Sequence, residues 1–227
     1  MCHQLTSLEL MSNTLISDTE ICVFIHTTGL NLKHLNLSDT SVGNRTVRKI
    51  LTTCSKLETL DLSSYNGVTT EAFDPSDLQC KATGVASINL SGCEMVEYSV
   101  INYLVGLFPK IIQHDLKCNS VITPEVFSKL TNYPELKRKI LRFGSIGIDD
   151  GVTFLCKSRL SKKLEEIDFH ENSNITDKSE NYGKFFCQFE IELVLNGCNN
   201  VPPDANDLSR KLLSLNGGKV FYEFRER

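Results

Sequence analysis

Leu32-Lys33-His34-Leu35-Asn36-Leu37-Ser38-Asp39-Thr40 is the stretch that decides the fold, because its spacing of apolar residues returns along the whole chain. The same Leu-x-x-Leu-x-Leu spacing opens the segments Leu5–Asn13, Leu57–Tyr65 and Val85–Cys93. Clear copies also begin at Leu164 and Glu190, and weaker copies begin near Ile111 and Arg138. The eight copies start at positions 5, 32, 57, 85, 111, 138, 164 and 190, so each unit has about 26 residues.

A period of this length with this spacing is the signature of leucine-rich repeats. We therefore predict an α/β fold: a right-handed solenoid, shaped as a horseshoe, with a parallel concave sheet and convex helices. It should contain about eight repeats and a terminal strand at 219–225. Residues 1–227 should form a single domain, since each unit buries its apolar face only against its neighbours.

The unit at 57–84 shows how one repeat is built. Leu60 and Leu62 share a strand face by the period of two and should both point into the core. Leu60→Ala should therefore cost about 2–5 kcal/mol through cavity formation, whereas Asp61→Ala should cost little stability. Thr69–Phe73 should open a helix with a threonine N-cap.

Other copies carry similar helix starts. Ser17-Asp18-Thr19-Glu20 forms a predicted capping box, and three further starts are expected at Thr123-Pro124, Asp149–Gly151 and Thr176-Asp177. In the sixth copy we place Leu141 and Phe143 inward, which makes Arg138 its first residue. A slip of one residue would instead turn Ile140 inward.

The first repeat is predicted to lack a polar cap. Only four residues precede Leu5, and Cys2 occupies the position that ends a helix in other copies. We expect self-association through this uncapped repeat, or its coverage by a partner or by the rest of a longer protein. The charged tail Arg225–Arg227 should keep the other edge free.

Composition narrows the classes of partner and compartment. The net charge is −4 with acids and bases mixed, so we expect no nucleic-acid partner, and no apolar stretch approaches the roughly 20 residues of a membrane span. Nine cysteines without a Cys-x-x-Cys pair favour buried free thiols, although disulfides or a zinc site remain alternatives. With no visible signal peptide, these features predict a cytoplasmic or nuclear protein that needs no cofactor.

Three segments resemble the cysteine-containing class of leucine-rich repeats: Cys187–Cys198, Leu90–Cys93 and Asn174–Asp177. The sequence departs from that pattern at Glu190, where an apolar residue is expected. The class is found in F-box/leucine-rich-repeat proteins, whose repeats hold substrates for a cullin-based ubiquitin ligase, and in the shorter antagonist of mitotic exit network protein. The resemblance implies protein partners, with cullin-ligase components among the candidates, but this chain shows no F-box ahead of Leu5.

Partner-binding residues should lie between the inward leucines, on the concave face. The candidates are His34, Asn36, Asp61, Asn89, Asp115, Arg142, Glu165, Glu166, Asp168, His170 and Glu192. Strands about 4.8 Å apart would put Arg142 between Asp115 and Asp168. The central column consists of Glu9, Asn36, Asp61, Asn89, Asp115, Arg142, Asp168 and Val194. It is either a ladder of lateral ion pairs that keeps the sheet soluble or a contact surface for a partner.

Two smaller features carry weaker hypotheses. Glu165, Glu166, Asp168, Glu171 and Glu192 form a predicted acidic patch, which either attracts a basic partner segment or is only a solvated face. Asp168 and His170 share a strand face near Glu171, which raises a metal hypothesis, but the spacing is generic.

The sequence contains no nucleophile elbow or phosphate loop, so we predict a protein without enzymatic activity. A GTPase-activating role has little support, because those repeats resemble the longer ribonuclease-inhibitor type. The leading interpretation is a protein-binding module that recognises a substrate or an adaptor. The alternative is a structural subunit of a large permanent assembly, axonemal or organellar.

Overall fold

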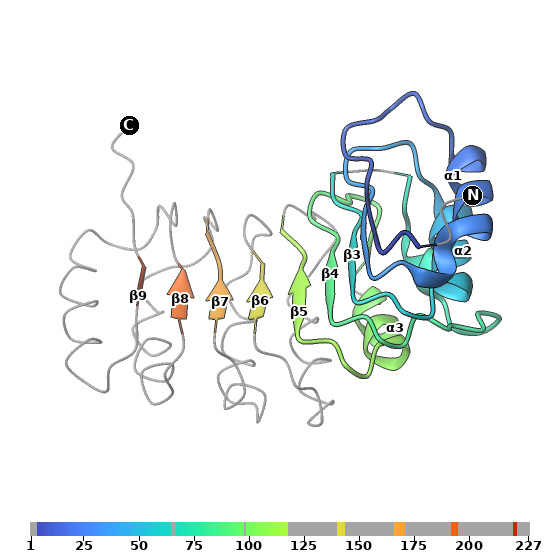
Figure 1. Cartoon of the computed structure of the whole chain (residues 1–227). Coiled ribbons are helices and arrows are strands. Elements are labelled where there is room, and N and C mark those ends of the chain that lie inside the picture. The colour runs from blue at the N-terminus through green and yellow to red at the C-terminus, as the bar shows by residue number, and fades with distance from the viewer. Residues whose placement is uncertain are drawn as a thin grey trace. The chain divides into compact units, whose positions relative to one another are not determined.

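The computed structural model describes residues 4–64, 67–97, 99–117, 140–143, 166–170, 192–194 and 220–221. They fall into two compact units, Met1–Val121 and Ile122–Arg227, and each unit is described by itself (Figure 1). The three helix starts predicted at Thr123-Pro124, Asp149–Gly151 and Thr176-Asp177 lie outside the described residues, as do Cys2, Cys187 and Cys198.

The first unit contains five short parallel strands that pair in chain order. They are β1 (Ser7–Glu9), β2 (His34–Asn36), β3 (Thr59–Asp61), β4 (Ser87–Asn89) and β5 (Gln113–Asp115). The register places Leu8 opposite Leu35, Leu35 opposite Leu60, and Leu60 opposite Ile88. Equivalent residues of successive repeats therefore pair with one another, as the 26-residue period predicts.

The inward orientation of the leucines is confirmed. Leu35 and Leu60 are 2% exposed, and the residues two positions further on, Leu37 and Leu62, are completely buried. Each such side chain contributes on the order of 1.5–3 kcal/mol when it leaves water. In the first repeat Leu5, Leu8 and Leu10 are only half-buried, and self-association through this repeat stays a prediction.

Helix α1 (Asp18–Thr28) begins at the predicted capping box, which is confirmed. The Ser17 hydroxyl oxygen accepts a hydrogen bond from the Glu20 N–H at 3.3 Å, and the Glu20 carboxylate accepts one from the Ser17 N–H at 2.9 Å. The Glu20 carboxylate also accepts from the Ser17 hydroxyl at 2.7 Å, and the two bonds that it accepts favour its charged form and so lower the pKa of Glu20. Helix α2 (Asn44–Thr53) lies beside α1, and α3 (Val100–Leu107) follows β4 (Figure 1).

The prediction of a threonine-capped helix after β3 is wrong. Residues Thr70–Phe73 form only a short 3₁₀ helix, η2, and the Thr69 side chain makes no capping bond. The Thr69 hydroxyl oxygen instead accepts a hydrogen bond from Asn44 Nδ2 at 2.8 Å, so it is engaged with the preceding repeat. Pro75 then disfavours a helical conformation at Asp74, which ends the turn.

The described residues of the second unit include four parallel strands that also pair in chain order. They are β6 (Ile140–Arg142), β7 (Glu166–Asp168), β8 (Glu192–Val194) and β9 (Val220–Phe221). Leu141 is completely buried and Phe143 is 1% exposed, which confirms the register with Arg138 as the first residue. The rings of Phe143 and Phe169 stack with their centroids 6.3 Å apart. Strand β9 lies within the predicted strand 219–225, whose other residues are outside the described part.

Burial is confirmed for three cysteines: Cys22, Cys54 and Cys93 have buried side chains, and Cys80 is half-buried. Burial raises the pKa of the Cys54 thiol to about 12, because an apolar environment disfavours the thiolate. The Cys93 thiol donates to the Leu62 carbonyl oxygen at 3.1 Å, which shows how cysteine at the ninth repeat position joins neighbouring repeats. No helix among the described residues is long and apolar enough to cross a bilayer.

Candidate interaction surface

The first and third residues of each strand project to the side of the sheet opposite the buried leucines, and we call this side the open face. In β1–β4 it consists of Ser7, Glu9, His34, Asn36, Thr59, Asp61, Ser87 and Asn89. Ser7, Glu9 and His34 are exposed, and the other five are half-buried. Short strands paired on an apolar core hold these side chains in a fixed, regularly spaced array.

Side chains at the third strand position cap the turn that follows their own strand. Asn36 Oδ1 accepts from the Ser38 N–H at 3.0 Å, and Asp61 Oδ1 accepts from the Ser63 N–H at 2.9 Å. The same bond joins Asn89 to Ser91, Asp115 to Lys117, and Asp168 to His170. The sequence analysis missed this role, although Asn and Asp two residues before a turn amide are a known turn signal.

Lateral hydrogen bonds use more of the same surface. Asn89 Nδ2 donates to Asp61 Oδ2 at 2.9 Å, and the His34 Nδ1 atom lies 3.0 Å from Thr59 Oγ1. Both oxygens of Asp61 are therefore engaged inside the protein. Within the described residues, the Glu9 carboxylate, the Asn36 side-chain NH₂ and His34 Nε2 make no hydrogen bond. In the part of the chain that the structure describes, these three groups of the open face are available to a partner.

Asp115 and Asp168 are less accessible than a concave contact surface requires. They are 8% and 7% exposed, because each folds back onto its own turn. Asp115 also lies 3.6 Å from the Lys117 ammonium group, and Asp168 Oδ1 is 2.8 Å from His170 Nδ1. Each occupies the third position of its own strand and bonds to a residue of the turn that follows.

The predicted ladder around Arg142 needs a correction. Arg142 is in register with Asp168, yet its Nε donates at 2.9 Å to Glu166, the first residue of β7. Strand twist and the length of the arginine side chain make such a diagonal pair reachable. The other predicted neighbour of Arg142 is Asp115, which belongs to the first unit, so that part of the ladder stays a prediction.

The metal hypothesis and the acidic patch are described only in part. Asp168 and His170 bond to each other, and no group of three or more His, Cys, Asp or Glu in the described part could hold a metal ion. Glu165 and Glu171 lie outside that part. Strand register does bring Glu192 opposite Glu166, so two members of the patch occupy neighbouring strands.

The loops that lead from strand to helix form a second stacked surface in the first unit. We call it the connection rim, made of residues 10–17, 37–43, 62–64 with 67–69, and 90–97. An equivalent residue in each loop has a positive φ: Ser12 (59°), Asp39 (53°), Ser64 (61°) and Gly92 (70°). Their N–H groups donate to Ser38, Ser63, Ser91 and Lys117 carbonyl oxygens at 2.6–2.9 Å, so the loops stack in register as the strands do.

The fold is similar to those of two solved structures. The first is the crystal structure of the Rad7 and Elc1 complex in yeast, at 11% identity and a TM-score of 0.60, covering 90% of this chain and 56% of that chain. The second is a leucine-rich repeat protein from Bacteroides thetaiotaomicron, at 13% identity and a TM-score of 0.57, covering 96% of this chain and 26% of that chain.

These likenesses show a leucine-rich-repeat-like fold, and the chain spans about half or less of the length of either neighbour. No protein-family model matches the sequence, and the comparison with curated proteins gives no match.

Proposed function

We propose that this protein is a non-enzymatic protein-binding module that recognises a substrate or an adaptor through its stacked repeats. The observation that carries the proposal is the open face: a rigid sheet that displays Glu9, His34 and Asn36 to solvent with unused donors and acceptors. Preorganised polar side chains lose little conformational entropy on binding, which suits a recognition surface.

The resemblance to F-box/leucine-rich-repeat proteins supports a role beside a cullin-based ubiquitin ligase, in the cytoplasm or nucleus. One fold neighbour was solved in a complex with a second protein, Elc1, which is consistent with a repeat fold that serves assembly. The leading role for this chain is therefore recognition, with any ligase components supplied by partner proteins.

The test combines cross-linking with affinity measurement. A photo-reactive amino acid at His34 should capture the partner, whereas one at Arg45, an exposed residue of α2, should not. The captured protein is then purified, and its Kd is measured for the wild-type chain and for variants.

Asn36→Asp is the sharpest variant, because it keeps the oxygen that caps Ser38 and replaces the free NH₂ group by a negatively charged acceptor. Together with His34→Ala it should weaken binding at least tenfold, with no change for Arg45→Ala. Equal affinity of all these variants would show that the open face is not the recognition surface.

A further inference from the structure

The connection rim carries apolar side chains that the fold does not use. Leu15 is 94% exposed, and Met11 and Met95 are each 55% exposed. The other large apolar side chains exposed in the described part lie elsewhere: Val23 and Phe24 on α1, Leu30 in the short 3₁₀ helix Gly29–Asn31, and Ile112 immediately before β5. Scattered single residues need no explanation, but exposed residues on one stacked surface suggest an interaction site.

Leu15 and Met95 occupy equivalent places, five residues after Leu10 and Leu90. Three repeat steps separate them, which is about 14 Å at the usual strand spacing. In the two loops between them, Ser41 and Gly67 stand immediately before the buried Val42 and Val68, as Leu15 and Met95 stand immediately before Ile16 and Val96. Ser41 Oγ donates to the Thr14 carbonyl oxygen at 3.2 Å, which keeps the first two loops in contact. An extended segment of about five residues spans this distance.

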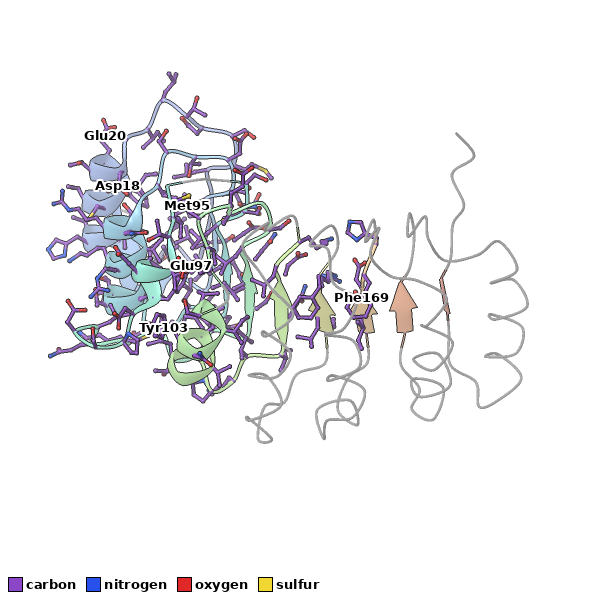
Figure 2. The ribbon with its side chains drawn as sticks, turned by 180° about the vertical axis from the view of Figure 1, so that it is seen from behind. Asp18, Glu20, Met95, Glu97, Tyr103 and Phe169 are labelled. Carbon is purple, nitrogen blue, oxygen red and sulfur yellow. The ribbon has the colours of Figure 1, made fainter. Side chains whose placement is uncertain are left out.

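The charged residues in the loops of the connection rim are all acidic. Its loops contain no Lys or Arg, but they contain Asp39, Glu94 and Glu97, which are exposed and whose carboxylates have no hydrogen bond or ion pair within the described residues. Figure 2 shows Met95 and Glu97 on this surface, with Asp18 and Glu20 at the start of α1. Two basic residues border these loops: Arg45 in α2, and Lys117, whose carbonyl oxygen accepts from the Gly92 N–H and whose ammonium group lies 3.6 Å from Asp115.

Helix stabilisation explains the acidic residues at the start of α1, but it does not explain Asp39 and Glu94. Asp18 and Glu20 lie in the first turn of α1, where the helix dipole favours them, and both accept backbone hydrogen bonds. Asp39 and Glu94 precede the next helix by at least five residues, beyond the reach of its first turn. Their carboxylates are therefore available to a ligand.

We propose that the connection rim docks an extended peptide segment in which apolar side chains alternate with Lys or Arg. The apolar side chains would cover Leu15 and Met95, and the basic groups would meet Asp39, Glu94 and Glu97. This inference rests on the proposed protein-binding function. It adds the connection rim as a docking surface and names the chemistry of the partner segment that would bind there. Charge complementarity of this kind sets partner choice and speeds encounter.

Synthetic nine-residue peptides test the proposal by fluorescence anisotropy with the full chain. A peptide that alternates Arg and Leu should bind at least tenfold more tightly than an Arg–Gly or a Glu–Leu peptide. Its affinity should fall as salt rises from 0.05 to 0.5 M, because exposed charges are screened. Failure of the Arg–Leu peptide to bind at 1 mM would overturn the proposal.

Two double variants locate the site. Leu15→Ser with Met95→Ser, and Glu94→Lys with Glu97→Lys, should each weaken binding of the Arg–Leu peptide at least tenfold. The controls are Leu30→Ser, the loss of one exposed apolar side chain away from the rim, and Glu71→Lys, the reversal of one exposed charge on η2. Thermal unfolding checks that each variant folds, and Met95→Gln with Glu97→Gln replaces any that does not.

The outcomes separate this inference from the proposed function. If Glu9→Lys abolished peptide binding and Glu94→Lys with Glu97→Lys did not, the rim would be excluded and the open face would remain the docking surface. If the partner captured by cross-linking bound all open-face and rim variants with equal affinity, both proposals would fail.

Discussion

Replacing Asp61 by alanine should lower the free energy of unfolding by about 1–3 kcal/mol, so the small cost expected from the sequence needs correction. The Asp61 carboxylate accepts three hydrogen bonds: from the Ser63 N–H at 2.9 Å, from the Ser63 hydroxyl at 2.6 Å, and from Asn89 Nδ2 at 2.9 Å. Each is worth about 0.5–1.5 kcal/mol net, and the half-exposed position lowers their sum because water can replace part of them.

A series of variants separates the contributions, with urea midpoints as the measurement. Asp61→Asn keeps the acceptor for Ser63 but sets an NH₂ group against that of Asn89, so it should cost only about 0.5–1.5 kcal/mol. Glu9→Ala, at an exposed position without a partner in the described residues, should stay within about 0.5 kcal/mol of wild type. Leu60→Ala should cost about 2–5 kcal/mol.

The order of these midpoints is the decisive result. If Asp61→Ala matched Glu9→Ala, the capping bonds would contribute nothing, and the open face would be free for binding along its whole length. If Asp61→Asn were as costly as Asp61→Ala, the lateral bond to Asn89 would dominate, and the turn cap would be the minor part.

Three further predictions concern single positions. Gly92→Ala should destabilise by about 1–2 kcal/mol, because its φ is 70° and a Cβ would meet Ser64 Cα at 3.4 Å, whereas Ser64→Gly should be neutral or stabilising by denaturation midpoint. Ser17→Ala should cost about 1 kcal/mol by the same assay, since the capping box with Glu20 is lost. The raised pKa of Cys54, about 12 against an ordinary 9.0, means that the unfolded chain releases this proton first as pH rises. Stability should therefore fall by about 2 kcal/mol between pH 8 and pH 10.5, and a Cys54→Ala variant should show a smaller fall.

The repeat period alone was enough to predict the strands and the inward side chains. Leu35, Leu60 and Ile88 recur at a fixed spacing, and burying them requires parallel strands that pair at equivalent positions. The capping box at Ser17 was also predictable, because both of its residues lie within four positions of each other. Such features depend on local sequence and on one periodic apolar pattern.

What only the tertiary structure decided is how each polar side chain is used. The pattern placed Asp61 and Asp115 on the open face but could not show that their oxygens are taken by turn amides and neighbouring strands. It likewise could not show that Arg142 bonds Glu166, or that Thr69 bonds Asn44 and leaves η2 without a cap. A polar group can bond to any of several partners that lie within about 3 Å. Residues 24 or more positions apart in the chain come this close only when the repeats stack.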